Sequence, residues 1–65
     1  MSHPALQIID EFLQDEDSNA QTRRNAAVAL ATIGDAEALQ RLMRLAISDG
    51  DAGVRAAAEA ELATA

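Results

Sequence analysis

Apolar residues recur along the chain at spacings of three and four, in four segments that are separated by short polar stretches. The first segment carries three apolar residues at this spacing and two beside them: Leu6, Ile9 and Leu13, then Ile8 and Phe12. The spacing matches the 3.6-residue period of an α-helix and predicts an amphipathic helix. We expect it to begin at His3 or Pro4, since proline suits the first turn, and to end in the acidic run Asp15-Glu16-Asp17.

The second segment opens with Ser18, which we predict as the N-cap. Gln21 lies three residues later, the spacing of a capping box. The residues expected to face the core are Thr22, Ala26, Ala29, Leu30 and Ile33. Gly34 is then predicted to end the helix in the left-handed conformation, and Asp35 to cap the next helix. Such a short connection predicts a tight helical hairpin.

A third and a fourth helix follow from the same pattern. The third is expected to run to about Ser48, with Leu39, Leu42, Met43 and Ala46 on its apolar side. Asp49-Gly50-Asp51 breaks the chain, and the fourth helix then turns Val54, Ala58 and Leu62 inward. No linker rich in Pro, Gly or Ser divides the chain. We therefore expect one all-α domain over residues 1–65.

The second half of the chain repeats the first. A shift of 32 residues places one set of residues on another: Asp17, Asn19, Thr22, Arg23, Ala26 and Leu30 on Asp49, Asp51, Val54, Arg55, Ala58 and Leu62. A shift of 33 places Ala5-Leu6-Gln7 on Ala38-Leu39-Gln40. Self-similarity at this period is typical of stacked helix pairs. The prediction is two antiparallel helix hairpins, about 3–33 and 36–65, stacked as a fragment of an α-solenoid.

Several aligned positions have a predicted structural role in this stack. Leu30 and Leu62 are expected to fill the core, while Gly34 and Asp35 form the turn between the two copies. Each of Arg23 and Arg55 is expected to pair with an acidic residue along the stack, such as Asp49 or Asp51. Acidic residues near helix N-termini also serve as caps and stabilise the positive end of the helix dipole.

The repeat motif resembles a known family. The residues are D-x-N-x-x-x-R-x-x-A-x-x-x-L-A-x-I-G-D-x-x-A-L-x-x-L from Asp17 to Leu42, and D-G-D-A-G-V-R-A-A-A-E-A-E-L from Asp49 to Leu62. They resemble the HEAT-like repeat named for phycobilisome (PBS) lyases. That resemblance implies a curved scaffold that binds a protein partner. It also implies an alternative role, as an accessory protein or subunit of a lyase system that handles bilin chromophores on phycobiliproteins.

Composition narrows the classes of function. The 65-residue chain has 11 acidic and 5 basic residues, a formal net charge of −6, which repels the phosphate backbone of nucleic acids. It contains no cysteine, so a disulfide or a thiolate metal site is excluded. No apolar run approaches the roughly 18 residues of a membrane span, and the first ten residues lack the pattern of a signal peptide. We expect an unprocessed cytoplasmic protein that binds neither membrane nor nucleic acid.

Candidate metal and catalytic residues are sparse. His3, Gln7 and Asp10 share one face of the first helix, too few ligands for a metal site. Asp15-x-Asp17-x-Asn19 and Asp49-x-Asp51 imitate the start of a calcium-binding loop. They lack its later glycine and glutamate, where this chain has Ala20 or Val54 and Ala26 or Ala60. No nucleophile with a partnering base is present. We expect no metal, no cofactor and no catalysis by this chain alone.

The candidate binding surface is apolar. The apolar side of the first helix is about 160° wide, more than one neighbouring helix covers, so Ile8 and Phe12 are expected to face a partner as well as the core. On the second helix Val28 lies opposite Leu30 and near Arg24, where solvent or a partner is expected. Repeat arrays need covered ends, because each unit cannot bury its apolar side alone. Homodimerisation through an open repeat face is the leading prediction, and docking on another protein is the alternative.

Overall fold

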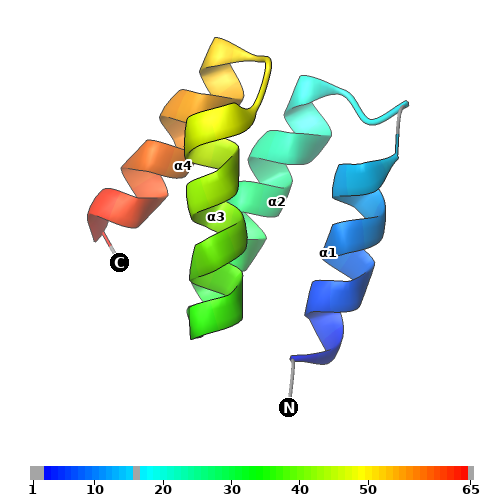
Figure 1. The fold of residues 1–65 in the computed structure, drawn as a ribbon, viewed down its shortest axis with the longest axis vertical. Helices are drawn as coiled ribbons and strands as arrows, with labels where there is room; N and C mark the ends of the chain where they lie inside the picture. Colours follow the sequence, from blue (N-terminus) through cyan, green and yellow to red (C-terminus); the bar gives the residue numbers. More distant parts are fainter. Residues whose placement is uncertain (1–2, 16, 65) are drawn as a thin grey trace.

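The computed structural model describes residues 3–15 and 17–64, and within them the fold is four α-helices joined by short turns. The helices are α1 (Pro4–Gln14), α2 (Ala20–Ile33), α3 (Ala36–Ser48) and α4 (Ala52–Thr64). They form two antiparallel hairpins, α1–α2 and α3–α4, that stack side by side (Figure 1). The predicted all-α fold is confirmed. Glu16 of the acidic run and Ala65 at the end of the second predicted copy lie outside the described residues.

Side-chain caps set the helix starts. The Nδ1 atom of His3 accepts a hydrogen bond from the N–H of Ala5, and Pro4 occupies the first turn of α1. Asp35 and Asp51 cap α3 and α4 by accepting from the N–H of Ala38 at 2.8 Å and of Val54 at 3.0 Å. These caps satisfy backbone donors that a helix leaves without an internal partner.

The predicted cap of α2 is wrong by one residue. Asn19 is the N-cap, and its Oδ1 accepts from the N–H of Thr22 at 2.8 Å. Ser18 instead offers its backbone carbonyl to Arg23, at 2.8 Å from Nη1. Asparagine and serine are comparable caps, so their intrinsic preference does not decide between them. The repeat alignment distinguishes the two residues, because Asn19 falls on Asp51, the cap of α4.

Gly34 makes the turn between α2 and α3, as predicted. Its φ of 68° is left-handed, a region that glycine enters without steric cost, and its N–H donates to the carbonyl of Leu30. Asp35 follows and starts α3 directly. Because only these two residues separate the helices, α3 turns back along α2.

One core joins the two hairpins. It contains eleven buried apolar residues: Leu6, Ile9, Ala26, Ala27, Leu30, Ala38, Leu42, Leu45, Ala46, Val54 and Ala58. Leu62, Leu13 and Ile33 are half-buried against it. Many contacts are made by alanine, which lets α2 and α4 lie close together. Met43, predicted on the apolar side of the third helix, is instead exposed.

Candidate protein-binding surfaces

Arg23 and Asp49 join the two hairpins through a fork of hydrogen bonds. Nε of Arg23 donates to Oδ2 of Asp49 at 2.8 Å, and Nη2 lies 3.3 Å from Oδ1. The third nitrogen, Nη1, donates to the carbonyl of Ser18. The Asp49 side chain is only 6% exposed. One nitrogen of Arg23 is therefore bound within the turn between α1 and α2, while the other two bind Asp49 of the second hairpin.

Charge and hydrogen bonding set the ionisation of Asp49. Burial would raise the pKa of its carboxyl. The hydrogen bonds from the Asp51 N–H and from Arg23, with the charges of Arg23 and Arg55, outweigh burial and lower that pKa. The carboxylate thus stays ionised, which matches its role as acceptor for Arg23.

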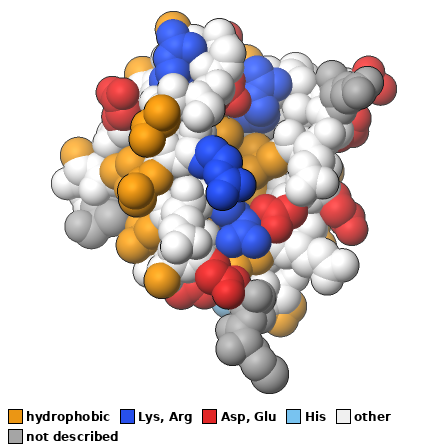
Figure 2. Space-filling view, in the orientation of Figure 1, with side chains coloured by type: hydrophobic (Ala, Val, Ile, Leu, Met, Phe, Trp, Pro, Cys, Tyr) orange, Lys and Arg blue, Asp and Glu red, His pale blue; other side chains and the backbone are white. Residues whose placement is uncertain are grey.

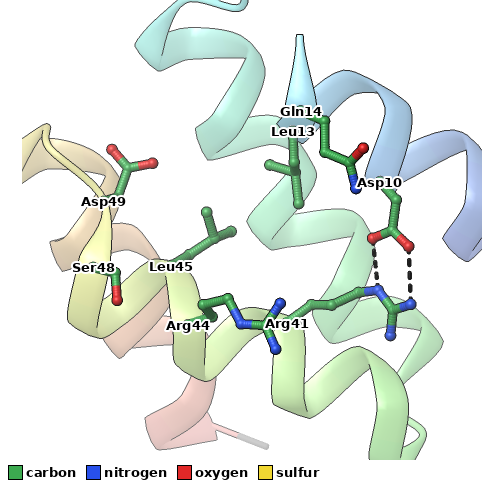
Figure 3. Close-up of a pocket in the computed structure, with 8 residues that line it drawn as sticks. All are labelled: Asp10, Leu13, Gln14, Arg41, Arg44, Leu45, Ser48 and Asp49. Carbon is green, nitrogen blue, oxygen red and sulfur yellow. Dashed lines mark hydrogen bonds and ion pairs between the residues drawn. The ribbon is translucent and has the colours of Figure 1, made fainter. Parts of the chain in front are cut away.

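A second ion pair, which the sequence did not predict, bridges α1 and α3. Nε and Nη2 of Arg41 donate to the two carboxylate oxygens of Asp10, at 2.6 and 2.9 Å (Figure 3). The hydrogen bond from Arg41 lowers the pKa of Asp10 and raises that of Arg41. Leu13 and Gln14 line the same groove opposite Arg44 and Leu45. This side of α1 therefore faces the second hairpin.

Arg55, like Arg23, donates to a backbone carbonyl of the turn before its helix, but one residue earlier in the repeat alignment, because Ser18 falls on Gly50 and not on Asp49. Its Nη1 donates to the carbonyl of Asp49, as Nη1 of Arg23 does to that of Ser18. Within residues 3–15 and 17–64, no acidic side chain lies within 4.0 Å of its guanidinium. Arg55 occupies on α4 the position that Arg23 occupies on α2, so the repeat alignment predicts that its remaining donors lie on the side of α4 away from the first hairpin.

Ile8 and Phe12 lie one turn apart on α1 and are 56% and 54% exposed. Phe12 borders an apolar groove between α1 and α2 whose other lining residues are Ile9, Thr22, Asn25, Ala26 and Ala29. This groove opens on the side of the first hairpin away from the second. We call this surface the N-terminal end face; it comprises Ala5, Ile8, Phe12, Thr22, Asn25 and Ala29.

Arg24 and Val28 belong to a different surface. Val28, 52% exposed, lies about 110° around α2 from the groove, by the 100° step of a helix. Arg24 donates to Oε1 of Gln21 and reaches toward α4, where its Nη1 lies 4.0 Å from Oδ1 of Asp51. The four predicted binding residues therefore form two separate pairs.

An apolar surface on α3 was not predicted from the sequence. Met43 and Ile47 lie one turn apart and are 48% and 76% exposed. A shift of 33 places them on Asp10 and Gln14, the α1 residues that face the second hairpin. They therefore lie on the outer side of the second hairpin, which we call the C-terminal end face: Met43 and Ile47 on α3, Arg55 and Glu59 on α4. Hydrophobic side chains gather over α3 and α4, while arginines lie down the middle of the molecule (Figure 2).

The described residues contain no group of three or more His, Cys, Asp or Glu side chains placed to hold a metal ion. Residues 3–15 and 17–64 also include no helix long and apolar enough to cross a membrane. His3 serves as the N-cap of α1, so its ring nitrogen has a structural role.

Comparison with known proteins gives one finding. A family model described as HEAT repeats matches residues 1–63, nearly the whole chain. No curated protein and no solved structure matches the chain.

Proposed function

We propose that this chain, which belongs to the HEAT-repeat family, is a non-catalytic protein-binding module whose binding surfaces are the two end faces of its helical stack. HEAT repeats generally mediate protein–protein interactions. The observation that carries the proposal is the location of the exposed apolar residues. Ile8 and Phe12 lie on one end face, and Met43 and Ile47 on the other.

The internal contact between the hairpins supports this assignment. Leu45, which corresponds to Phe12 in the repeat alignment, is buried where the second hairpin meets the first. Phe12 on α1 is instead 54% exposed, at the edge of the groove between α1 and α2. Burying such side chains is worth about 25 cal/mol per Å², so a protein that covers them gains binding energy. Aromatic and methionine side chains are also enriched in the centres of protein interfaces.

Site-specific photocrosslinking in the native cell tests the proposal. A photoreactive phenylalanine analogue replaces Phe12 in one variant and Gln40, an exposed residue on α3 outside both end faces, in the control. We expect a covalent protein adduct from position 12 and a much weaker one from position 40. Equal labelling at the two positions, or no protein adduct from position 12, would contradict the proposal.

The motif resemblance to PBS lyases supports an alternative function, that of an accessory protein or subunit of a lyase system that handles bilins. A chain that handles bilins shifts the visible absorption of a free bilin added to it. A scaffold that contacts only the protein leaves that spectrum unchanged. Titrating a free bilin with the purified chain thus distinguishes the lyase-system function from the protein-binding scaffold.

A further inference from the structure

We propose that copies of this chain stack head to tail, with the C-terminal end face of one copy on the N-terminal end face of the next. The inference rests on the proposed function and names its partner, a second copy in one orientation. The contact between the two hairpins within the chain serves as the template. Several residues of that contact have aligned residues that are exposed on the outer sides of the stack, and these aligned residues are complementary.

The helices α1 and α3 provide the first pair of positions. Within the chain, Asp10 of α1 meets Arg41 of α3. Shifted by 33, Asp10 becomes Met43 and Arg41 becomes Ile8. In a head-to-tail contact the ion pair is therefore replaced by two apolar residues. Both members change together, so neither a charge nor an apolar side chain is left without a suitable neighbour.

One turn further along α1 and α3, the aligned residues on the two end faces are again apolar. Gln14 lines the internal groove near Leu45. Their aligned residues are Ile47 and Phe12, both exposed. The apolar residues of the C-terminal end face thus fall opposite those of the N-terminal end face. A random placement of exposed apolar residues would not match in this way.

On α2 and α4 the replacement goes the other way: apolar residues in the contact within the chain align with polar residues on the end faces. Ala27 lies one turn beyond Arg23, on the side of α2 that packs on α4, and is fully buried. It corresponds to Glu59, which is exposed. On α4, the helix that α2 packs on, the buried Val54 and half-buried Ala57 correspond to Thr22 and Asn25. A buried carboxylate needs hydrogen-bond donors, and a hydroxyl and an amide occupy those positions.

Arg55 supplies the charged contact. Its Nη1 donates to the carbonyl of Asp49 in the turn before α4, so one nitrogen of the guanidinium is held by its own chain. The acceptor of Arg23 is Asp49, and the residue aligned with Asp49 is Asp17, which is exposed. Arg55 of one copy therefore pairs with Asp17 of the next. The attraction between Arg55 of one copy and Asp17 of the next favours contact between unlike faces over contact between like faces.

Such an interface joins two different surfaces and does not close after two copies. Each added copy leaves one N-terminal and one C-terminal end face open, so the assembly extends into a longer solenoid. A dimer built on a two-fold axis would instead bring the same face together twice. The two arrangements predict different responses when one face is blocked.

A complementation experiment by analytical ultracentrifugation tests the inference. One variant carries Ile8→Glu and Phe12→Glu, and the other Met43→Glu and Ile47→Glu. We expect the unmodified chain to grow beyond a dimer as concentration rises, and each variant alone to remain monomeric. An equimolar mixture of the two should form a single species of twice the 6.8 kDa chain mass, because each variant keeps one intact face.

Controls keep the result interpretable. Val28→Glu changes an equally exposed residue outside both end faces and should leave assembly unchanged. Circular dichroism verifies that every variant stays helical. In the mixture, Arg55→Asp in the first variant should weaken the complex by roughly tenfold, and Asp17→Arg in the second should restore it.

Three outcomes would overturn the inference: an unmodified chain that stays monomeric to millimolar concentration, a face-blocked variant that still dimerises, or a mixture that remains monomeric. The proposed function is judged separately, by the crosslink from position 12. A crosslink to a different protein, with a monomeric purified chain, would reject the head-to-tail stack and leave the proposed function standing.

Discussion

Arg23 of α2 and Asp49 at the start of the α3–α4 turn are bound to each other by two side-chain hydrogen bonds, at 2.8 and 3.3 Å. Asp49 also accepts from the N–H of Asp51 through Oδ1 at 2.9 Å. The Asp49 carboxylate thus holds the α3–α4 turn in place and binds it to the first hairpin. In a chain whose core is largely alanine and leucine, this pair sets how the hairpins are aligned.

Replacing that carboxylate should destabilise the fold. We expect Asp49→Ala to lower the free energy of unfolding by about 2 to 3 kcal/mol, since hydrogen bonds to charged groups contribute about 1.5 to 3 kcal/mol. Urea denaturation followed by circular dichroism measures the change. Asp17→Ala is the matched control, because Asp17 is the aligned but exposed residue, and it should stay within about 0.5 kcal/mol of the unmodified chain. Equal losses in the two variants would contradict the role assigned to Asp49.

Stability should also fall in acid. The pKa values of Asp10 and Asp49 are lowered in the folded state, so the folded chain binds protons less readily than the unfolded chain. Their contribution to the free energy of unfolding is complete above the ordinary carboxyl pKa of about 3.9. It is lost as pH falls through the lowered pKa values of the folded state. Urea denaturation at a series of acidic pH values should show this decline. The double variant Asp10→Asn, Asp49→Asn should be less stable near neutral pH and show a shallower decline.

The repeat pattern predicted the fold well because each helix carries its own boundaries. Gly34, Asp35 and the Asp49-Gly50-Asp51 break mark helix ends through local backbone chemistry. The aligned Leu and Ala positions then indicate which sides pack together. The error at Ser18 arose because two good caps are adjacent, and only the alignment with Asp51 distinguishes them.

The binding surfaces were harder to predict, because exposure depends on which neighbour covers a residue. Met43 follows the helical apolar spacing, yet it points away from the first hairpin and is exposed. The bridge between Asp10 and Arg41 links residues on two different helices, which periodicity within one helix does not indicate. Aligning the two repeat copies relates the exposure of Met43 to the Asp10–Arg41 ion pair, since Met43 falls on Asp10, on the side of α1 that meets α3.

The turn at Gly34 offers a test of backbone conformation. A left-handed residue with a side chain costs roughly 1 to 2 kcal/mol, so we expect Gly34→Ala to lower the free energy of unfolding by about that amount. Gly50→Ala is the control: its φ is not positive, and an added Cβ meets no atom within 4 Å. That substitution should be neutral or slightly stabilising. Thermal unfolding of the two variants gives the comparison, and a larger loss at position 50 would contradict the assignment.

Leu30 and Leu62 occupy aligned positions in the two hairpins but differ in how far they are covered. Leu30 is fully buried between the hairpins, whereas Leu62, near the end of α4, is only half-buried. We expect Leu30→Ala to cost about 2 to 5 kcal/mol, as for a leucine removed from a packed core, and Leu62→Ala clearly less. Denaturation of dilute chain measures this difference. At high concentration the cost of Leu62→Ala should rise if a second copy covers α4, because the lost side chain would then leave a buried cavity. An unchanged difference at all concentrations would show that α4 stays uncovered.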